Sequence, residues 1–150
     1  MFRWLVFCTC ILASVAFSAD VTGNWKLNTA KSKYTGIPMP KDLAVTYTPA
    51  GTGWHYEASG TSGTGDPIKS SFTYVKDGAD ISTTGFPNWD TLVLTNAAAG
   101  QGSGVMKRGG KQVGTLTRTT SADGKTMTIR ANVTTPEGKK ASYVSVYDKQ

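Results

Sequence analysis

The residue types that most often do chemistry are sparse in this chain and do not form a catalytic pattern. His55 is the only histidine among the 150 residues, so a metal site or a Ser-His-acid triad would depend on it alone. Its neighbours Trp54 and Tyr56 would face the opposite side of a strand. We therefore expect His55 to face solvent, with a role as haem ligand as the alternative. The sequence predicts no catalytic residue, metal site or cofactor.

Aspartate and glycine patterns give no stronger signal. Asp77, Asp80 and Asp90 flank turns, where aspartate is common because it hydrogen-bonds to nearby backbone. The series Gly100-x-Gly102-x-Gly104 lacks the strand-to-helix context and the later acidic residue of a dinucleotide site. It is more simply explained as a flexible turn. An enzyme is therefore the less favoured interpretation.

Aromatic side chains, by contrast, recur at alternate positions of strand-like segments. If they point inward, they either line a ligand cavity or fill a solid core, since barrels of about eight strands occur in both forms. Residues 29–41 and 85–89 would frame the entrance of such a cavity, and the aromatics of 85–89 look exposed. The candidates for the cavity or its mouth are Trp54, Tyr56, Phe72, Tyr74, Phe86, Trp89 and Leu92.

Turn sequences recur along the chain at nearly even intervals, for example at 76–78 and 122–125. Between them lie short segments of alternating apolar and polar residues, which is the pattern of antiparallel hairpins. No segment shows the sustained spacing of an amphipathic helix. About ten strands are expected, at residues 21–28, 43–48, 54–58, 68–75, 80–83, 91–95, 104–107, 112–120, 126–134 and 141–148.

These strands predict an all-β fold, an antiparallel up-and-down meander of about eight to ten strands closed into a barrel. Closure would pair residues 21–28 with 141–148 and so remove both sheet edges. The outward faces carry Glu57, Lys69, Arg130 and many threonines. They offer no unbroken apolar band, so a barrel that spans an outer membrane is not expected.

The first strand contains Gly23-Asn24-Trp25. The glycine lets the chain bend, and the tryptophan can plug the base of the core. This Gly-x-Trp resembles the first strand of the lipocalin/calycin superfamily. There a basic side chain from a late strand packs on the tryptophan, which implies Arg118 or Arg130 here, with Arg118 preferred.

A longer set of residues resembles one family within that superfamily. Trp25-Lys26-Leu27-Asn28, the segment 30–34 and the terminal segment 144–149 are similar to exported bacterial lipocalin-like proteins of uncharacterised activity. The resemblance runs over the whole mature chain. Fatty-acid-binding proteins, which share the superfamily, hold a carboxylate with an Arg-x-Tyr on the last strand. This chain has Ser145-Val146-Tyr147 there, so the resemblance implies the barrel but not fatty-acid binding.

Residues 1–18 have the features of a secretory signal peptide. Arg3 precedes a short apolar run, and Ala16-Phe17-Ser18 places small residues before a cleavage after Ser18, with cleavage after Ala19 as the alternative. The run is too short for a membrane span, so a retained anchor is the weaker interpretation. Cleavage would remove both Cys8 and Cys10. The mature domain, residues 19–150, would then be free of cysteine in a periplasmic or secreted location.

The formal net charge of +6 is spread over turns rather than interleaved with aromatics, so no nucleic-acid partner is expected. Taken together, the sequence predicts an exported, non-enzymatic binding protein for a small hydrophobic molecule. One alternative is a structural or protein-interaction module of the cell envelope, with a filled barrel and contacts through Phe86, Trp89 and the basic hairpin ends. An enzyme on a calycin scaffold is the other.

Overall fold

The computed structural model describes residues 20–97 and 100–150. The expected signal peptide at 1–18, its cleavage site and both cysteines lie outside these residues. Within them, no helix has the length and apolar character needed to cross a membrane. The strands are β1 (Gly23–Leu27), β2 (Lys33–Thr35), β3 (Asp42–Ala50), β4 (Gly53–Thr61), β5 (Pro67–Tyr74), β6 (Asp80–Ser82), β7 (Thr91–Thr95), β8 (Gln101–Arg108), β9 (Lys111–Thr120), β10 (Thr126–Thr134) and β11 (Lys140–Lys149).

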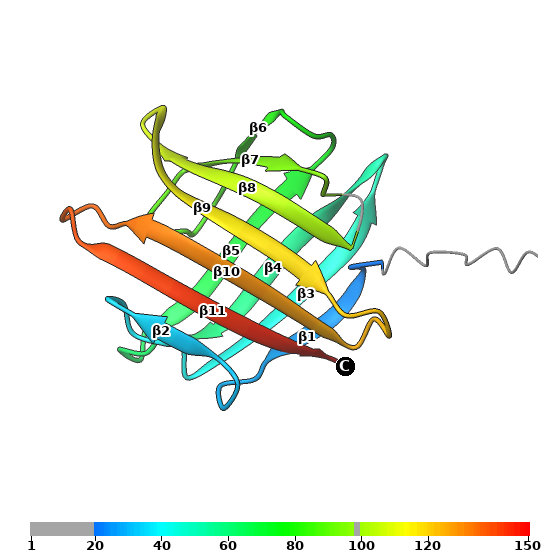
Figure 1. The fold of residues 1–150 in the computed structure, drawn as a ribbon, viewed down its shortest axis with the longest axis horizontal. Coiled ribbons are helices and arrows are strands. Elements are labelled where there is room, and N and C mark those ends of the chain that lie inside the picture. The colour runs from blue at the N-terminus through cyan, green and yellow to red at the C-terminus, as the bar shows by residue number, and fades with distance from the viewer. Residues whose placement is uncertain (1–19, 98–99) are drawn as a thin grey trace, which may run out of the picture.

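All eleven strands belong to one sheet that curls into a nearly closed barrel (Figure 1). The strand order is β5-β4-β3-β1-β11-β10-β9-β8-β7-β6, and β2 pairs with β11 beside this path. Every pairing is antiparallel. The predicted all-β meander is therefore confirmed.

The first and last long segments close the cylinder, as predicted. In the β1–β11 pair, Trp25 lies opposite Lys149 and Leu27 lies opposite Tyr147. The strands at the ends of the path are β5 and β6, and one isolated bridge joins β5 to Thr84, two residues beyond β6. There Ser71 and Thr84 exchange two backbone hydrogen bonds, of 3.0 and 2.9 Å between N and O. Because no full ladder of backbone hydrogen bonds joins these two strands, this is the weakest junction between neighbouring strands of the barrel.

In an up-and-down barrel, successive connections alternate between the two ends. The β3–β4 turn, the β7–β8 connection and the β9–β10 turn share one end with the C-terminus, and we call this end the base. The β4–β5, β6–β7 and β10–β11 connections lie at the other end, which we call the mouth. Figure 1 shows the two ends at the right and the left of the view.

Trp25 plugs the base as the sequence predicts, but its cationic neighbour differs. Its ring is 1 % exposed, and its Nε1–H donates to the Val21 carbonyl over 2.8 Å. The Lys149 ammonium lies 5.3 Å from the ring centroid, because the register places Lys149 directly opposite Trp25. Arg130 is exposed on β10, and Arg118 packs on other rings. The prediction that one of these arginines covers Trp25 is wrong.

Two segments expected to be irregular contain strands. Residues 33–35 form β2, and β8 begins at Gln101 inside the glycine series expected to be a flexible turn. Gly104 is buried there, and a Cβ on it would lie 3.0 Å from Leu116 Cγ and from Leu94 Cδ2. The glycines of this segment therefore make room inside the barrel for large side chains on the adjoining strands.

Replacing Trp25 with alanine is expected to lower the free energy of unfolding by about 3–5 kcal/mol, because the change leaves a large cavity at a site with little room to collapse. Urea denaturation followed by circular dichroism measures this. The control is Val75→Ala, since Val75 is 55 % exposed and its truncation should change stability by less than about 0.5 kcal/mol. Equal losses for the two variants would contradict the role given to Trp25.

Candidate functional site

The barrel encloses a cavity of about 1120 Å³ that runs from the mouth toward the base. Most of its wall is apolar or aromatic, and residues of nearly all the long strands contribute to it. Six of the seven residues predicted for the cavity or its mouth line it: Trp54, Tyr56, Phe72, Phe86, Trp89 and Leu92. That these residues contact a ligand stays a prediction.

Stacked rings from β4 and β5 form one wall of the cavity. Tyr56 stacks on Phe72 with ring centroids 4.7 Å apart, and Trp54 stacks on Tyr74 at 5.0 Å. Tyr74 is the predicted residue that does not line the cavity. It lies behind Trp54, and its hydroxyl donates to Asp77 over 3.0 Å. Its part is therefore to fix the Trp54 ring rather than to face the interior.

Phe86 and Trp89, expected to be exposed, fold inward at the mouth. They stack at 4.8 Å, with Trp89 9 % exposed and Phe86 half-buried. Arg108 holds their loop in place by donating to the Asn88 carbonyl over 2.7 Å. Residues 36–38 and Pro40 line the same cavity, so both segments predicted to frame the entrance contribute to its wall.

The base of the cavity holds a buried positive charge. Arg118 lies on β9 near the β9–β10 turn, is 6 % exposed and lines the cavity. Its guanidinium carbon is 5.2 Å from the Trp54 ring centroid and 5.8 Å from that of Tyr47. Nη2 donates to the Ala97 carbonyl over 2.7 Å. Among the described residues, Nε has no hydrogen-bond partner and no carboxylate forms a salt bridge with the guanidinium.

The last strand contributes polar groups that sequence reasoning did not assign to the cavity. Tyr143, Ser145 and Tyr147 occupy alternate positions of β11 and line the cavity. Tyr34 of β2 stacks on Tyr143 with ring centroids 5.2 Å apart, and its hydroxyl is hydrogen-bonded to Ser145 Oγ. The period-two alternation on β11 could have predicted that its tyrosines face the interior. Tyr34 could not be placed, because β2 was not expected.

Burial keeps these tyrosines protonated. It raises the pKa of Tyr56, Tyr143 and Tyr147 far above the ordinary value of about 10. Burial also raises the pKa of Tyr47, and the nearby Arg118 charge partly opposes that rise. At neutral pH the base of the cavity therefore presents hydroxyl groups and one guanidinium, while Asp66, Lys69, Glu137 and Lys139 line the cavity at the mouth. Among the described residues, no carboxylate forms a salt bridge with that guanidinium.

The candidate acid–base residues lie elsewhere. His55 is on the outer face of β4, where Nδ1 is hydrogen-bonded to Thr73 Oγ1 over 2.8 Å, so it points away from any haem held inside. A backbone N–H donated by Ala97 lowers the pKa of Asp77, and one donated by Gly109 lowers that of Asp90. These carboxylates hold turns together. In the described part of the chain, no group of three or more His, Cys, Asp or Glu is placed to bind a metal ion.

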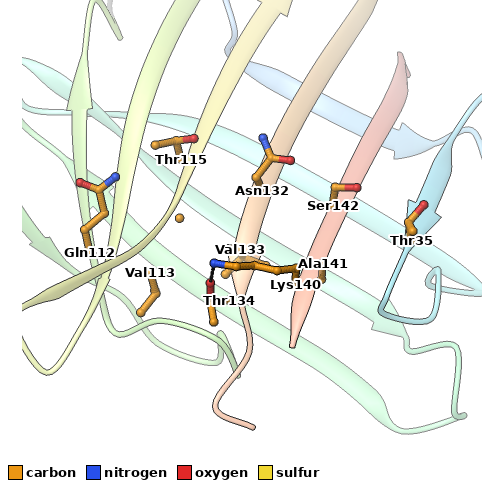
Figure 2. A pocket seen from close by; sticks show the side chains of 11 residues that line it. Thr35, Gln112, Val113, Thr115, Asn132, Val133, Thr134, Lys140, Ala141 and Ser142 are labelled. Atoms are coloured by element: carbon orange, nitrogen blue, oxygen red, sulfur yellow. Dashed lines mark hydrogen bonds between the residues drawn. The ribbon is translucent and has the colours of Figure 1, made fainter. Parts of the chain in front are cut away.

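A shallower hollow of about 520 Å³ lies over β2, β9, β10 and β11 (Figure 2). Thr115, Asn132, Ser142 and Thr35 form a row of paired positions across these four strands. The row is polar and at least partly exposed. None of the buried polar atoms left without a partner among the described residues lies here. The interior cavity is therefore the stronger candidate site.

No protein-family model matches the chain, and no curated protein matches it. Two solved structures have a similar fold. Zebrafish ileal bile acid-binding protein complexed with cholic acid is 11 % identical, with a TM-score of 0.49, over 86 % of this chain and 98 % of that one. The siderocalin Ex-FABP is 11 % identical, with a TM-score of 0.39, over 87 % of this chain and 74 % of that one. With 11 % identity and TM-scores below 0.5, neither likeness carries an argument about the function of this chain.

The tyrosine environment predicts cooperative unfolding at alkaline pH. The pKa of each of the six tyrosines is raised in the folded state. Above pH 10 the unfolded chain therefore binds fewer protons than the native one, and stability falls as the pH rises. Each group that stays protonated contributes up to about 1.4 kcal/mol per pH unit. Absorbance at 295 nm and circular dichroism should change together. Full ionisation of the tyrosines with the fold intact would contradict the burial described above.

Proposed function

We propose that this protein is a non-enzymatic binding protein that takes up one small apolar molecule inside its barrel. The observation that carries this proposal is the cavity of about 1120 Å³ with its aromatic wall. Ligand sites of small-molecule binding proteins usually measure roughly 300–1,000 Å³ and combine apolar walls with a few polar groups. A single ligand of moderate size therefore matches the available space.

Unpartnered donors in the wall support the same function. The indole Nε1–H groups of Trp54 and Trp89 are buried and have no acceptor among the described residues, and both side chains line the cavity. A buried donor without an acceptor costs about 1–3 kcal/mol. A bound molecule that carries an acceptor, or water that enters with it, removes that cost.

The alternative of a filled barrel that works through its surface has less support. The interior is hollow, and the aromatics that would have formed the surface contact, Phe86 and Trp89, are turned inward. The acid–base candidates considered from the sequence, His55, Asp77, Asp80 and Asp90, do not line the cavity, so they give an enzyme no support.

Export is part of the proposal. The features of residues 1–18 support a cleaved signal peptide, and the resemblance to exported bacterial lipocalin-like proteins supports a periplasmic or secreted location. A barrel stabilised without disulfides is compatible with such a compartment.

A neutral hydrophobic dye tests ligand uptake. Nile red is expected to bind with one site per chain and to quench tryptophan fluorescence, because Trp54 and Trp89 line the cavity. Phe72→Ala should weaken binding roughly tenfold by removing an aromatic contact. The matched control is Thr73→Ala on the outer face, which should leave affinity unchanged. Absence of saturable binding, or equal effects of the two variants, would count against the proposal.

Processing is tested by the mass of the protein recovered from outside the cytoplasm. The expected N-terminus is Ala19, after cleavage behind Ser18, and the processed chain should give no reaction with a thiol reagent because both cysteines are gone. A recovered protein that retains residue 1, or that reacts as a thiol, would refute export by cleavage.

A further inference from the structure

We propose that the ligand is an apolar monocarboxylic acid whose carboxylate pairs with Arg118 at the base of the cavity. This inference rests on the proposed function and narrows it to one class of ligand. Its starting point is a charged side chain that is 6 % exposed, lines the cavity and has an unpartnered Nε.

The charge of Arg118 is not neutralised within the described structure. A guanidinium cannot lose its proton in a protein, so burial cannot discharge it as it can a lysine or histidine. The salt bridges of the described residues are His55–Glu57 and Lys107–Asp80, and neither involves Arg118. Asp77 comes nearest in the network, but it accepts from the Ala97 backbone N–H while Arg118 donates to the Ala97 carbonyl. The backbone of Ala97 therefore bridges the two side chains, which form no salt bridge with each other.

The rings beside Arg118 attract the cation but do not provide a counter-ion. Trp54 and Tyr47 lie within 6 Å of the guanidinium carbon, and such contacts contribute far less than a buried charge costs. Solvent that enters an empty cavity can hydrate the free edge of the guanidinium. A neutral ligand that displaced this solvent would leave the charge dry and unpaired, whereas a carboxylate replaces the lost hydration with a charge-assisted hydrogen bond.

The shape of the site favours a planar group that carries one negative charge. A carboxylate matches the planar fork of a guanidinium, and the Trp54 ring beside it carries an unpartnered indole N–H. A single negative charge balances the one cation at the base, whereas a dianion would leave excess charge in that buried part of the cavity. The apolar part of the molecule would then extend along Phe72 and Leu116 toward the aromatic pair at the mouth.

A matched pair of probes tests this assignment. Binding of dodecanoate and of 1-dodecanol, which differ in the head group but share the apolar chain, is measured by tryptophan fluorescence at neutral pH. The native protein is expected to prefer dodecanoate at least tenfold. Arg118→Met should abolish the preference by weakening dodecanoate roughly 10- to 100-fold while dodecanol is unaffected. Arg118→Lys, which keeps the charge but loses the planar fork, should retain part of the preference.

Arg130→Met is the matched control, since it removes the same formal charge from the exposed face of the next strand. It should bind both probes as the native protein does. Circular dichroism checks that each variant is folded, and Arg118→Met should unfold at a temperature no lower than the native protein does, because an unpaired buried charge is gone.

The outcomes separate the two proposals. If dodecanol and Nile red bind but dodecanoate is not preferred, or if Arg118→Met keeps the preference, the monocarboxylate assignment is wrong while the apolar-ligand function stands. If none of the three probes binds, both proposals fail.

Discussion

The pairing of β1 with two partners is the interaction on which the rest of the structure depends. This five-residue strand lies between β3 and β11 and so joins the two halves of the sheet. Without it, both halves would have open edges, and their inward faces would be exposed to water. Trp25 strengthens the join because its ring is buried under the strands that β1 connects. Pairing of β1 with both neighbours therefore closes the sheet into a barrel that can enclose a cavity.

The interior is hollow rather than filled because of the sizes of the inward side chains. Trp25, Met106 and Met127 are almost fully buried. The inward positions that line the cavity include Gly102, Ser70 and Ser145, which are too small to meet across the barrel. Stacked rings such as Tyr56–Phe72 lie along the wall. Barrels of about eight strands are just wide enough for side chains to fill, and in this barrel of eleven strands the small inward residues leave space at the centre.

The sequence predicted the features that depend on the alternation of apolar and polar residues and on turn residues. The alternation of apolar and polar residues predicted most of the strands and the burial of Trp25 and Leu27. The need to remove open sheet edges predicted the β1–β11 pair. Period two tells which face a residue occupies but not how far along the barrel it lies. For that reason Arg118 was expected to pack on Trp25, whereas it packs on Trp54 and Tyr47.

Local composition also failed to predict the structure of the glycine-rich segment of β8 and of the mouth. A glycine-rich run suggests a loop, yet Gly102 and Gly104 lie in a strand, and at Gly104 the neighbouring side chains leave little room for a Cβ. The aromatics at 85–89 looked exposed because a bend normally faces solvent. The contacts of Phe86 with Tyr56 and Phe72, and the Arg108 hydrogen bond to Asn88, turn this segment inward, and both involve residues distant in sequence.

The charge of Arg118 lies where stability alone would not place it. On β9, Leu116 lies nearer the mouth, while Arg118 and the buried, unpartnered Thr120 hydroxyl lie at the base. A fold that needed only to bury apolar surface would place every charge at the mouth, where water solvates it, as it does Asp66, Lys69, Glu137 and Lys139. Here one cation, Arg118, sits at the end farther from bulk water, among the rings of Trp54 and Tyr47. Such an arrangement destabilises the empty protein. It is physically reasonable when a complementary molecule completes it, because the head group of an amphipathic acid that enters first would pair with this cation.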